Sequence, residues 1–316
     1  MNTLLGWEFS MNKAKLGRRR RSELIFVAVL LFIPILHLCF FWVYVNVDTI
    51  ILSFQRFDSE AQDYVFSGIE NYTQIFREFG ANSGLIRRAV LNSFFVFFWN
   101  DLVLLPVSLV FAYILFRGMP GAQVFRVIFF LPCIISVVVL TMVFGFMFDT
   151  NVGLVPDLLR ILGLQDIIPD TGYFAGATAF PMLLLYGLWS GIGNNIVLVN
   201  GAIRRIPTEI FDAAKLDGVS VWREFFNIVV PLIGGTIATL LLLGVTLVTG
   251  YFLQPMLLMP GVPEAYTLGY YIVSQVNTST NLGLPAAMGN LCILFAVPLV
   301  WVMRKIVEHM FPAYEY

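Results

Sequence analysis

The side chains of this sequence that could do chemistry are polar groups placed inside long apolar runs. Asn100 and Asp101 lie in "FFVFFWNDLVLL", and Ser190 and Asn194 lie four residues apart in "YGLWSGIGNNIVLVNG". Residues four apart share one face of a helix. These groups donate and accept hydrogen bonds, so they predict non-covalent recognition of a polar partner rather than bond breaking.

The rest of the sequence does not indicate covalent or metal chemistry. His37 and His309 are its only histidines, and neither lies near cysteines or carboxylates at metal-ligand spacing. Cys39, Cys133 and Cys292 each fall in an apolar run, where a thiol behaves as a small hydrophobe. The pattern G-x-x-x-x-G-K-[ST] is absent, so no P-loop for ATP is present. We therefore predict no catalytic residue, metal site or cofactor in this chain, and an external source for the energy it uses.

The composition indicates that these polar groups lie in a membrane. Of 316 residues, 59% are hydrophobic and only 12% are charged, whereas soluble domains contain about 25% charged residues. A helix needs about 20 mostly apolar residues to cross the hydrocarbon core, because lipid offers its backbone no hydrogen-bond partner. Six stretches qualify: roughly 24–46, 89–116, 124–148, 175–200, 228–252 and 285–304. The sequence predicts an all-α integral membrane protein with six transmembrane helices.

The basic residues predict how these helices are oriented. With a cytoplasmic N-terminus, fourteen of the nineteen Lys and Arg residues fall on the cytoplasmic side, as the positive-inside rule requires. Both termini are then cytoplasmic. Segment 1–23 is too long and polar to begin a cleaved signal peptide, so we expect a retained basic segment followed by one membrane domain, 24–316. The net charge of −1 gives no overall field that would attract nucleic acid.

The loops on the other side of the membrane, 47–88, 149–174 and 253–284, are longer than turns. Within them "GIENYTQIF" and "VGLVPDLLRILGL" carry apolar residues at helical spacing. Such helices lie along the membrane surface or present a face to a partner, or else they pack on the chain's own helices. The spacing alone leaves both alternatives open.

A polar segment, 201–227, separates the fourth and fifth spans on the cytoplasmic side. Pro207 suits a first helical turn, residues 208–216 favour helix, and Asp217-Gly218 favours a turn because glycine reaches positive φ at little cost. Helix resumes over 221–228, and a proline at 231 should bend the start of the next span.

On the first of these short helices, Ile210, Ala213 and Ala214 predict a small apolar face. This face suits docking into a groove on another protein. The alternative is an ordinary loop helix that lies on the bilayer surface.

This segment resembles the EAA loop of ABC importer permeases, in which E-A-A is followed by a glycine and then by I-x-L-P. The chain has Asp212-Ala213-Ala214, Gly218 and, at 228–231, "IVVP". Aspartate stands at 212 where glutamate is usual, and valine at 230 where leucine is usual. The resemblance assigns ATPase coupling to Glu209, Asp212, Ala213, Ala214, Asp217, Gly218 and Pro231.

Other segments resemble carbohydrate permeases in the same order along the chain. "FSGIENYTQIF" is similar to the segment before their second span, "FRVIFFLPCII" to the start of their third, and "LMPGVPEAYTLGYYIV" to the region after their fifth. The resemblance implies a subunit of the bacterial inner membrane that pairs with a second permease. It also implies two ATPase subunits that bind ATP and Mg, and an extracytoplasmic binding protein that delivers sugar.

The resemblance further implies where sugar would bind. Trp189 and Gly191 match a W-x-G that contacts sugar in permeases of the maltose type, although Asn194 stands where those proteins have an aromatic residue. Tyr251 lies in a region that lines the sugar path in relatives. Asn100 and Asp101 join these candidates because a mid-span carboxylate costs about 2.5–3.5 kcal/mol and should face a cavity or a partner.

Simpler roles and other functions stay open at this point. Trp189 is equally consistent with a packing aromatic, and Tyr251 with the aromatic belt of a membrane protein. The solute could be a polyol phosphate or a peptide. An ion-coupled transporter would work without nucleotide and would make Asp101 essential, whereas a membrane enzyme should show clustered histidines or carboxylates.

Overall fold

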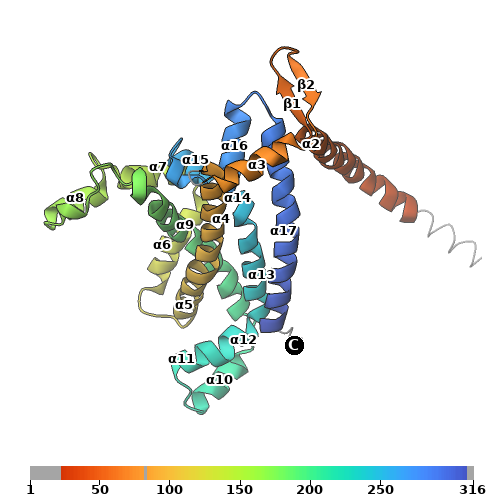
Figure 1. The fold of residues 1–316 in the computed structure, drawn as a ribbon. Coiled ribbons are helices and arrows are strands. Elements are labelled where there is room, and N and C mark those ends of the chain that lie inside the picture. Colours follow the sequence, from red (N-terminus) through yellow and green to blue (C-terminus); the bar gives the residue numbers. More distant parts are fainter. Residues whose placement is uncertain (1–22, 82–83, 312–316) are drawn as a thin grey trace, which may run out of the picture.

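The computed structural model describes residues 23–81 and 84–311, and helices dominate it (Figure 1). Four helices in this part of the chain are long and apolar enough to cross a membrane: Glu23–Ser53, Leu85–Phe116, Gly176–Ile203 and Gly283–Met310. Two pairs of shorter helices raise the number to six if each bent pair is one span. The predicted basic segment lies, apart from Glu23, outside the described residues.

The first long helix extends away from the rest of the molecule (Figure 1). It includes a π-helical stretch, Leu38–Tyr44, and ends in α2, Val45–Ser53. Only α2 packs on the bundle, against α17, Gly283–Met310. The most apolar window of the first helix is 0% buried within this chain.

The third predicted span is not one helix. The sequence predicts continuous helix over 124–148, but the structure divides it into α6, Ala122–Ile134, and α7, Val137–Met147, bent by 114°. Pro132 lies near the end of α6 and has no N–H to continue the helical hydrogen bonds. Ser136 then caps α7, where its hydroxyl oxygen accepts a hydrogen bond from the Val139 N–H at 3.4 Å.

The fifth predicted span is bent where the sequence predicts a bend. Residues Val221–Leu232 and Gly234–Gly250 meet at 73°, directly after Pro231. The first part consists of α11, Val221–Glu224, a π-helical stretch, Phe225–Val229, and α12, Val230–Leu232. The second part consists of α13, Gly234–Val245, and α14, Leu247–Gly250.

The region before the second span contains the two strands found in the described residues. β1, Gln55–Asp58, pairs antiparallel with β2, Asp63–Phe66, with Gln55 opposite Phe66 and Asp58 opposite Asp63. The prediction of an all-α fold missed this hairpin, because the strands are only four residues long and show no clear alternation of polar and apolar residues. The predicted helix in "GIENYTQIF" is confirmed as α3, Glu70–Gly80.

The two loop helices use their apolar faces differently. In α3, Ile75 is buried with Ile86, Tyr271 and Leu284, so this helix packs on the chain's own helices. In α8, Leu154–Ile161, Pro156 is buried, but Leu154, Leu158 and Ile161 are exposed, and Ile161 is 81% accessible. The alternative of an internally packed helix therefore applies to α3, while α8 leaves part of its apolar surface exposed.

The remaining elements are short. α15, Leu253–Leu258, and α16, Leu268–Thr278, lie toward the end of the molecule that carries the β1–β2 hairpin (Figure 1). Short 3₁₀ turns are found at Gln165–Ile167, Gly176–Thr178 and Pro263–Ala265. The predicted polar helix is confirmed as α10, Thr208–Leu216. It lies at the end of the molecule opposite the β1–β2 hairpin (Figure 1).

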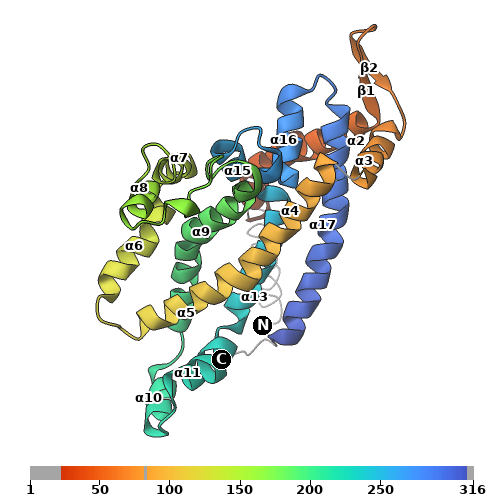
Figure 2. The ribbon, with the colours of Figure 1, turned by 60° about the vertical axis from the view of Figure 1, so that its left-hand side comes forward.

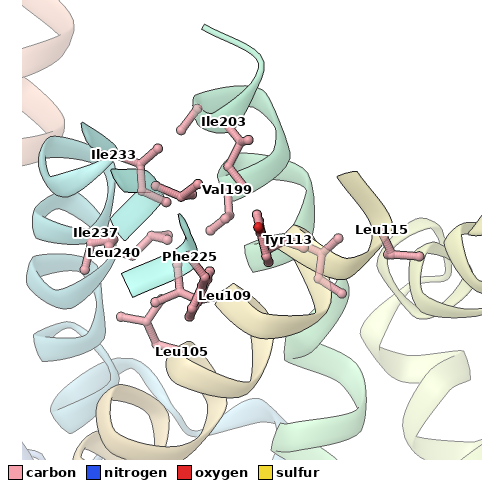
Figure 3. Close-up of a cluster of buried hydrophobic side chains, with 14 of the residues drawn as sticks. Leu105, Leu109, Tyr113, Leu115, Val199, Ile203, Phe225, Ile233, Ile237 and Leu240 are labelled. Atoms are coloured by element: carbon pink, nitrogen blue, oxygen red, sulfur yellow. The ribbon is translucent and has the colours of Figure 1, made fainter. Parts of the chain in front are cut away.

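The main hydrophobic core lies where α5, Leu105–Phe116, and α9, Ala179–Ile203, meet the fifth span. Figure 3 shows its side chains converging from α5, α9, α13 and the polar segment. Leu115 and Tyr113 of α5 are each 1% exposed, and Ile203 of α9 is fully buried. The core therefore joins the spans to the segment that follows α10.

Glycines in α9 let this helix approach its neighbours closely, and it runs between α6 and α13 (Figure 2). A Cβ at Gly193 would overlap the carbonyl oxygen of Phe129 in α6 and would crowd the Cys133 sulfur. A Cβ at Gly191 would lie 2.8 Å from the Cδ2 atom of Leu104. Small residues allow this kind of backbone approach between membrane helices.

Gly193→Val should therefore destabilise the protein, because its side chain has no room against the α6 backbone. We expect an overpacking penalty of about 1–3 kcal/mol or more and a lower melting temperature in detergent. Gly201→Val is the matched control, because Gly201 is in the same helix and meets nothing within 4 Å. Equal melting temperatures for the two variants would contradict this close packing.

Candidate functional site

A cavity of about 340 Å³ opens between α4, Leu85–Trp99, the α6–α7 break, α9 and the segment that follows α14. Its volume falls in the usual range for small-molecule sites, about 300–1,000 Å³. Four predicted substrate residues line it: Asn100, Gly191, Asn194 and Tyr251. The other lining residues are Val96, Trp99, Leu104, Pro132, Cys133, Ile135, Val137, Leu140, Leu183, Leu184, Tyr186, Gly187, Ser190, Leu247 and Gln254.

Asn100 and Asp101 are the first two residues of a π-helical stretch, Asn100–Leu104. It forms just before Pro106, which has no N–H to donate, and the Leu105 N–H bonds back to the Asn100 carbonyl. Asn100 lines the cavity, and its amide donates to Asp101 Oδ1 at 3.0 Å.

Asp101 lies against α13 and is only 6% exposed. A Cβ at Gly244 would overlap its Oδ1 atom, and its Oδ2 atom has no hydrogen-bond partner among the described residues. Ser108 and Ala112, further along the same span, are buried as well. The Asp101 carboxyl therefore faces a helix of the same chain and does not line the cavity, although its hydrogen-bond partner Asn100 does.

Trp189 lies outside the group of described residues that line the cavity. Its ring stacks on Phe144 at 5.6 Å with an interplanar angle of 29°, and it meets Tyr186 edge-on at 6.3 Å. Here the side chain takes the packing role that the sequence leaves open as an alternative.

Tyr251 is buried beside the cavity rather than in an exposed aromatic belt. It is 8% exposed, and a Cβ at Gly187 would lie 3.3 Å from its hydroxyl. Its backbone carbonyl accepts a 2.5 Å hydrogen bond from the Thr267 hydroxyl. Trp99, next to Asn100, also lines the cavity, although the sequence analysis does not select it.

The predicted coupling residues gather on α10 and the turn after it. Glu209, Asp212, Ala213 and Asp217 are exposed, and Asp212 forms a 3.2 Å ion pair with Lys215. Gly218 has φ +65°, which confirms the predicted glycine turn. Pro231 is half-buried in α12, just before the bend.

The predicted apolar face of α10 is partly wrong. Ala213 is exposed, whereas Phe211 and Ala214 are buried and Ile210 is half-buried. Phe211 packs on Phe116 of α5, with ring centroids 5.3 Å apart. The helix therefore uses its largest apolar residue to pack on this chain, and its acidic side stays in solvent.

A buried carboxylate fixes this segment to the second long span. Glu224 is 1% exposed and accepts a 2.8 Å hydrogen bond from the Tyr113 hydroxyl. Arg117 Nη1 lies 3.5 Å from the same carboxylate oxygen. A charged pair and a hydrogen bond therefore join α11 to the end of α5. In the sequence Glu224 is one charge in a polar segment, and its spacing does not predict its burial.

Within residues 23–81 and 84–311, no three His, Cys, Asp or Glu side chains are placed together to hold a metal ion.

Curated relatives match the chain over most of its length. The diacetylchitobiose uptake system permease of Streptomyces coelicolor is 27% identical over 307 residues, covering 91% of this chain and 84% of that protein. The sn-glycerol-3-phosphate transport system permease of Yersinia pseudotuberculosis is 26% identical, covering 81% of this chain and 85% of that one. An arabinooligosaccharide transport system permease of Bacillus subtilis is 25% identical, covering 84% and 83%.

A solved structure shares the fold. It is a bacterial ABC transporter involved in import of the acidic polysaccharide alginate, with a TM-score of 0.76 and 19% identity, covering 93% of this chain and 99% of that one. The model of a protein family matches residues 104–313, which contain the cavity-lining part of α9 and the whole polar segment. The chain thus belongs to the family of binding-protein-dependent transport system inner membrane components.

Proposed function

We propose that this chain is a permease subunit of an ATP-driven importer, and that a sugar or oligosaccharide passes through the 340 Å³ cavity. The observation that carries this proposal is the cavity itself, which is lined by Asn100, Ser190 and Tyr251 between helices of membrane-spanning length. Such hydroxyl and amide groups can replace the water around a sugar. The relatives named for diacetylchitobiose and arabinooligosaccharides support a carbohydrate.

A charged solute is less well matched by the cavity. One relative is named for sn-glycerol-3-phosphate, and a phosphate is usually held by Arg or Lys. Of the described residues that line the cavity, none is an Arg, Lys, Asp, Glu or His. The chain's contribution to the site therefore favours a neutral carbohydrate over a polyol phosphate, and the ion-coupled alternative is not favoured by the relatives.

In this proposal six spans cross the bacterial inner membrane, each bent helix pair counting as one, with both termini in the cytoplasm. The α10 segment and the end of α17 lie at the same end of the molecule (Figure 1), and Phe311 packs on Gly234 there. The exposed acidic side of α10 suits a partner surface. We assign that surface to one of two ATPase subunits, which bind ATP and Mg and supply the energy.

A second permease and a sugar-binding protein complete the proposed importer. The most apolar part of the first helix is 0% buried within this chain, so its surface is free to contact another subunit or lipid. The solved alginate transporter was also determined with a periplasmic protein that carries an alginate pentasaccharide, at a TM-score of 0.73. This supports delivery of the solute by a binding protein, which we place at the end of the molecule opposite α10.

Gly218→Asp should uncouple uptake. It adds an acidic side chain to the turn after α10 and places a non-glycine residue at φ +65°, with about 1–3 kcal/mol of strain. We expect sugar uptake to fall about tenfold, and fewer ATPase subunits to co-purify, with normal membrane insertion.

Gly163→Asp is the control for this variant. Gly163 has φ +72° with nothing within 4 Å, and it follows α8, far from α10 (Figure 1). Its uptake should stay near the wild-type rate. Normal uptake and normal ATPase retention in Gly218→Asp would refute the role given to this turn.

Ser190→Trp should block the solute path, because a large ring would fill the cavity that Ser190 lines. Uptake should be lost while the permease still assembles with its ATPase subunits. Leu198→Trp places the same ring on the outer face of α9, where Leu198 is 49% exposed, and should transport normally. Uptake by Ser190→Trp at the control rate would show that the solute takes another route.

A further inference from the structure

Three aromatic side chains of the cavity carry a buried polar atom that has no hydrogen-bond partner in the described part of the chain: the indole Nε1–H of Trp99 and the hydroxyls of Tyr186 and Tyr251. Buried donors are almost always paired in native proteins, because water no longer solvates them. Tyr186 is fully buried as a residue, whereas Tyr251 is 8% exposed and Trp99 is half-buried. A molecule bound in the cavity could therefore supply the missing partner of Trp99 and of Tyr251.

The two groups come from different elements. Trp99 is the last residue of α4, directly before the π-helical stretch, and Tyr251 follows α14. Their ring atoms also pack with the cluster that includes Val96 and Leu183, so each side chain is held in place. An indole N–H can only donate, whereas a phenol can donate or accept. The pair therefore fits a ligand that presents oxygen acceptors.

The charges around the cavity restrict that ligand further. Asp101 is the nearest acidic neighbour in sequence, but its carboxyl lies against Gly244 of α13. Asn100 lines the cavity, while its amide Nδ2 donates to Asp101 Oδ1 and lies beside Gly244 as well. With uncharged donors and a flat aromatic face, the site fits the ring oxygens, hydroxyls or acetamido carbonyls of an uncharged carbohydrate.

Trp189, the tryptophan that the sequence analysis selects, is not among the described residues that line the cavity. Its ring stacks on Phe144 at 5.6 Å and meets Tyr186 edge-on at 6.3 Å. The tryptophan that lines the cavity is instead Trp99, at the end of α4.

We propose that Trp99 is a substrate-contacting residue of the importer, whose indole N–H donates to an oxygen of an uncharged carbohydrate, with the Tyr251 hydroxyl as the second donor. This inference rests on the proposed function. It adds a contact residue and a ligand class to the same cavity.

The test uses the complete importer with its ATPase subunits and binding protein in proteoliposomes. Four radiolabelled probes are compared: diacetylchitobiose, maltose, glucuronic acid and glycerol 3-phosphate. Wild-type protein should import an uncharged probe and neither anion. For that probe Trp99→Phe, which keeps a ring but removes the N–H, should raise KM by about threefold to tenfold. The yield of assembled complex should not change.

Three further variants make the result specific. Tyr251→Phe removes only a hydroxyl and should raise KM by a similar factor, which tests the site even if Trp99→Phe assembles poorly. Trp301→Phe is the matched control, since Trp301 is 57% exposed on α17, and Trp189→Phe tests the competing tryptophan. Both should keep the wild-type KM.

Several outcomes would overturn the inference. Unchanged KM in both Trp99→Phe and Tyr251→Phe would do so, as would an increase confined to Trp189→Phe or import of the anions alone. Import of none of the four probes by the wild-type complex would count against the proposed function as well. If Ser190→Trp abolishes uptake but Trp99→Phe leaves it unchanged, the proposed Trp99 contact would be refuted, while the proposed solute path through the cavity would stand.

Discussion

The close approach of α9 to its neighbours is the constraint on which the rest of this molecule depends. Gly193 packs against the α6 backbone, Gly191 packs against the Leu104 side chain, and Gly187 lies next to the Tyr251 hydroxyl. Without Cβ atoms at these positions three other elements can contact one central helix, and the space left between them is the cavity. In a membrane, where lipid is as apolar as the side chains, such packing replaces the hydrophobic effect as the main reason for helix association.

The polar segment is attached to this bundle by electrostatics as well as by packing. The Glu224 carboxylate accepts a hydrogen bond from the Tyr113 hydroxyl, and Arg117 Nη1 lies 3.5 Å from the same carboxylate oxygen. The Phe225 ring also packs on the Tyr113 ring, with centroids 5.0 Å apart. Breaking a buried pair by removing one partner leaves an uncompensated charge, which is costly. These contacts join α11 to α5, and α5 directly follows the π-helical stretch beside the cavity.

Much of the fold can be predicted from local sequence properties. The helix at 208–216, the turn at Gly218 and the bend after Pro231 are all confirmed, because each depends on the residues at that place. Predictions that depend on how neighbouring elements pack were less accurate. Continuous helix over 124–148 is wrong, because the break after Pro132 is completed by the Ser136 cap. Ala213 is exposed, because the position of α5 makes Phe211 the buried residue of α10.

The sequence by itself determined that the chain is membrane-embedded and where most of its apolar spans lie, because apolar length, charge and glycine placement act locally. It also identified the polar residues from which a site could be built. Only the tertiary structure decided which of them share a cavity. Asn100 enters it and Asp101 does not, Trp99 lines it and Trp189 packs elsewhere. Adjacent residues point in different directions on a helix, and which direction meets a cavity depends on how the neighbouring helices pack.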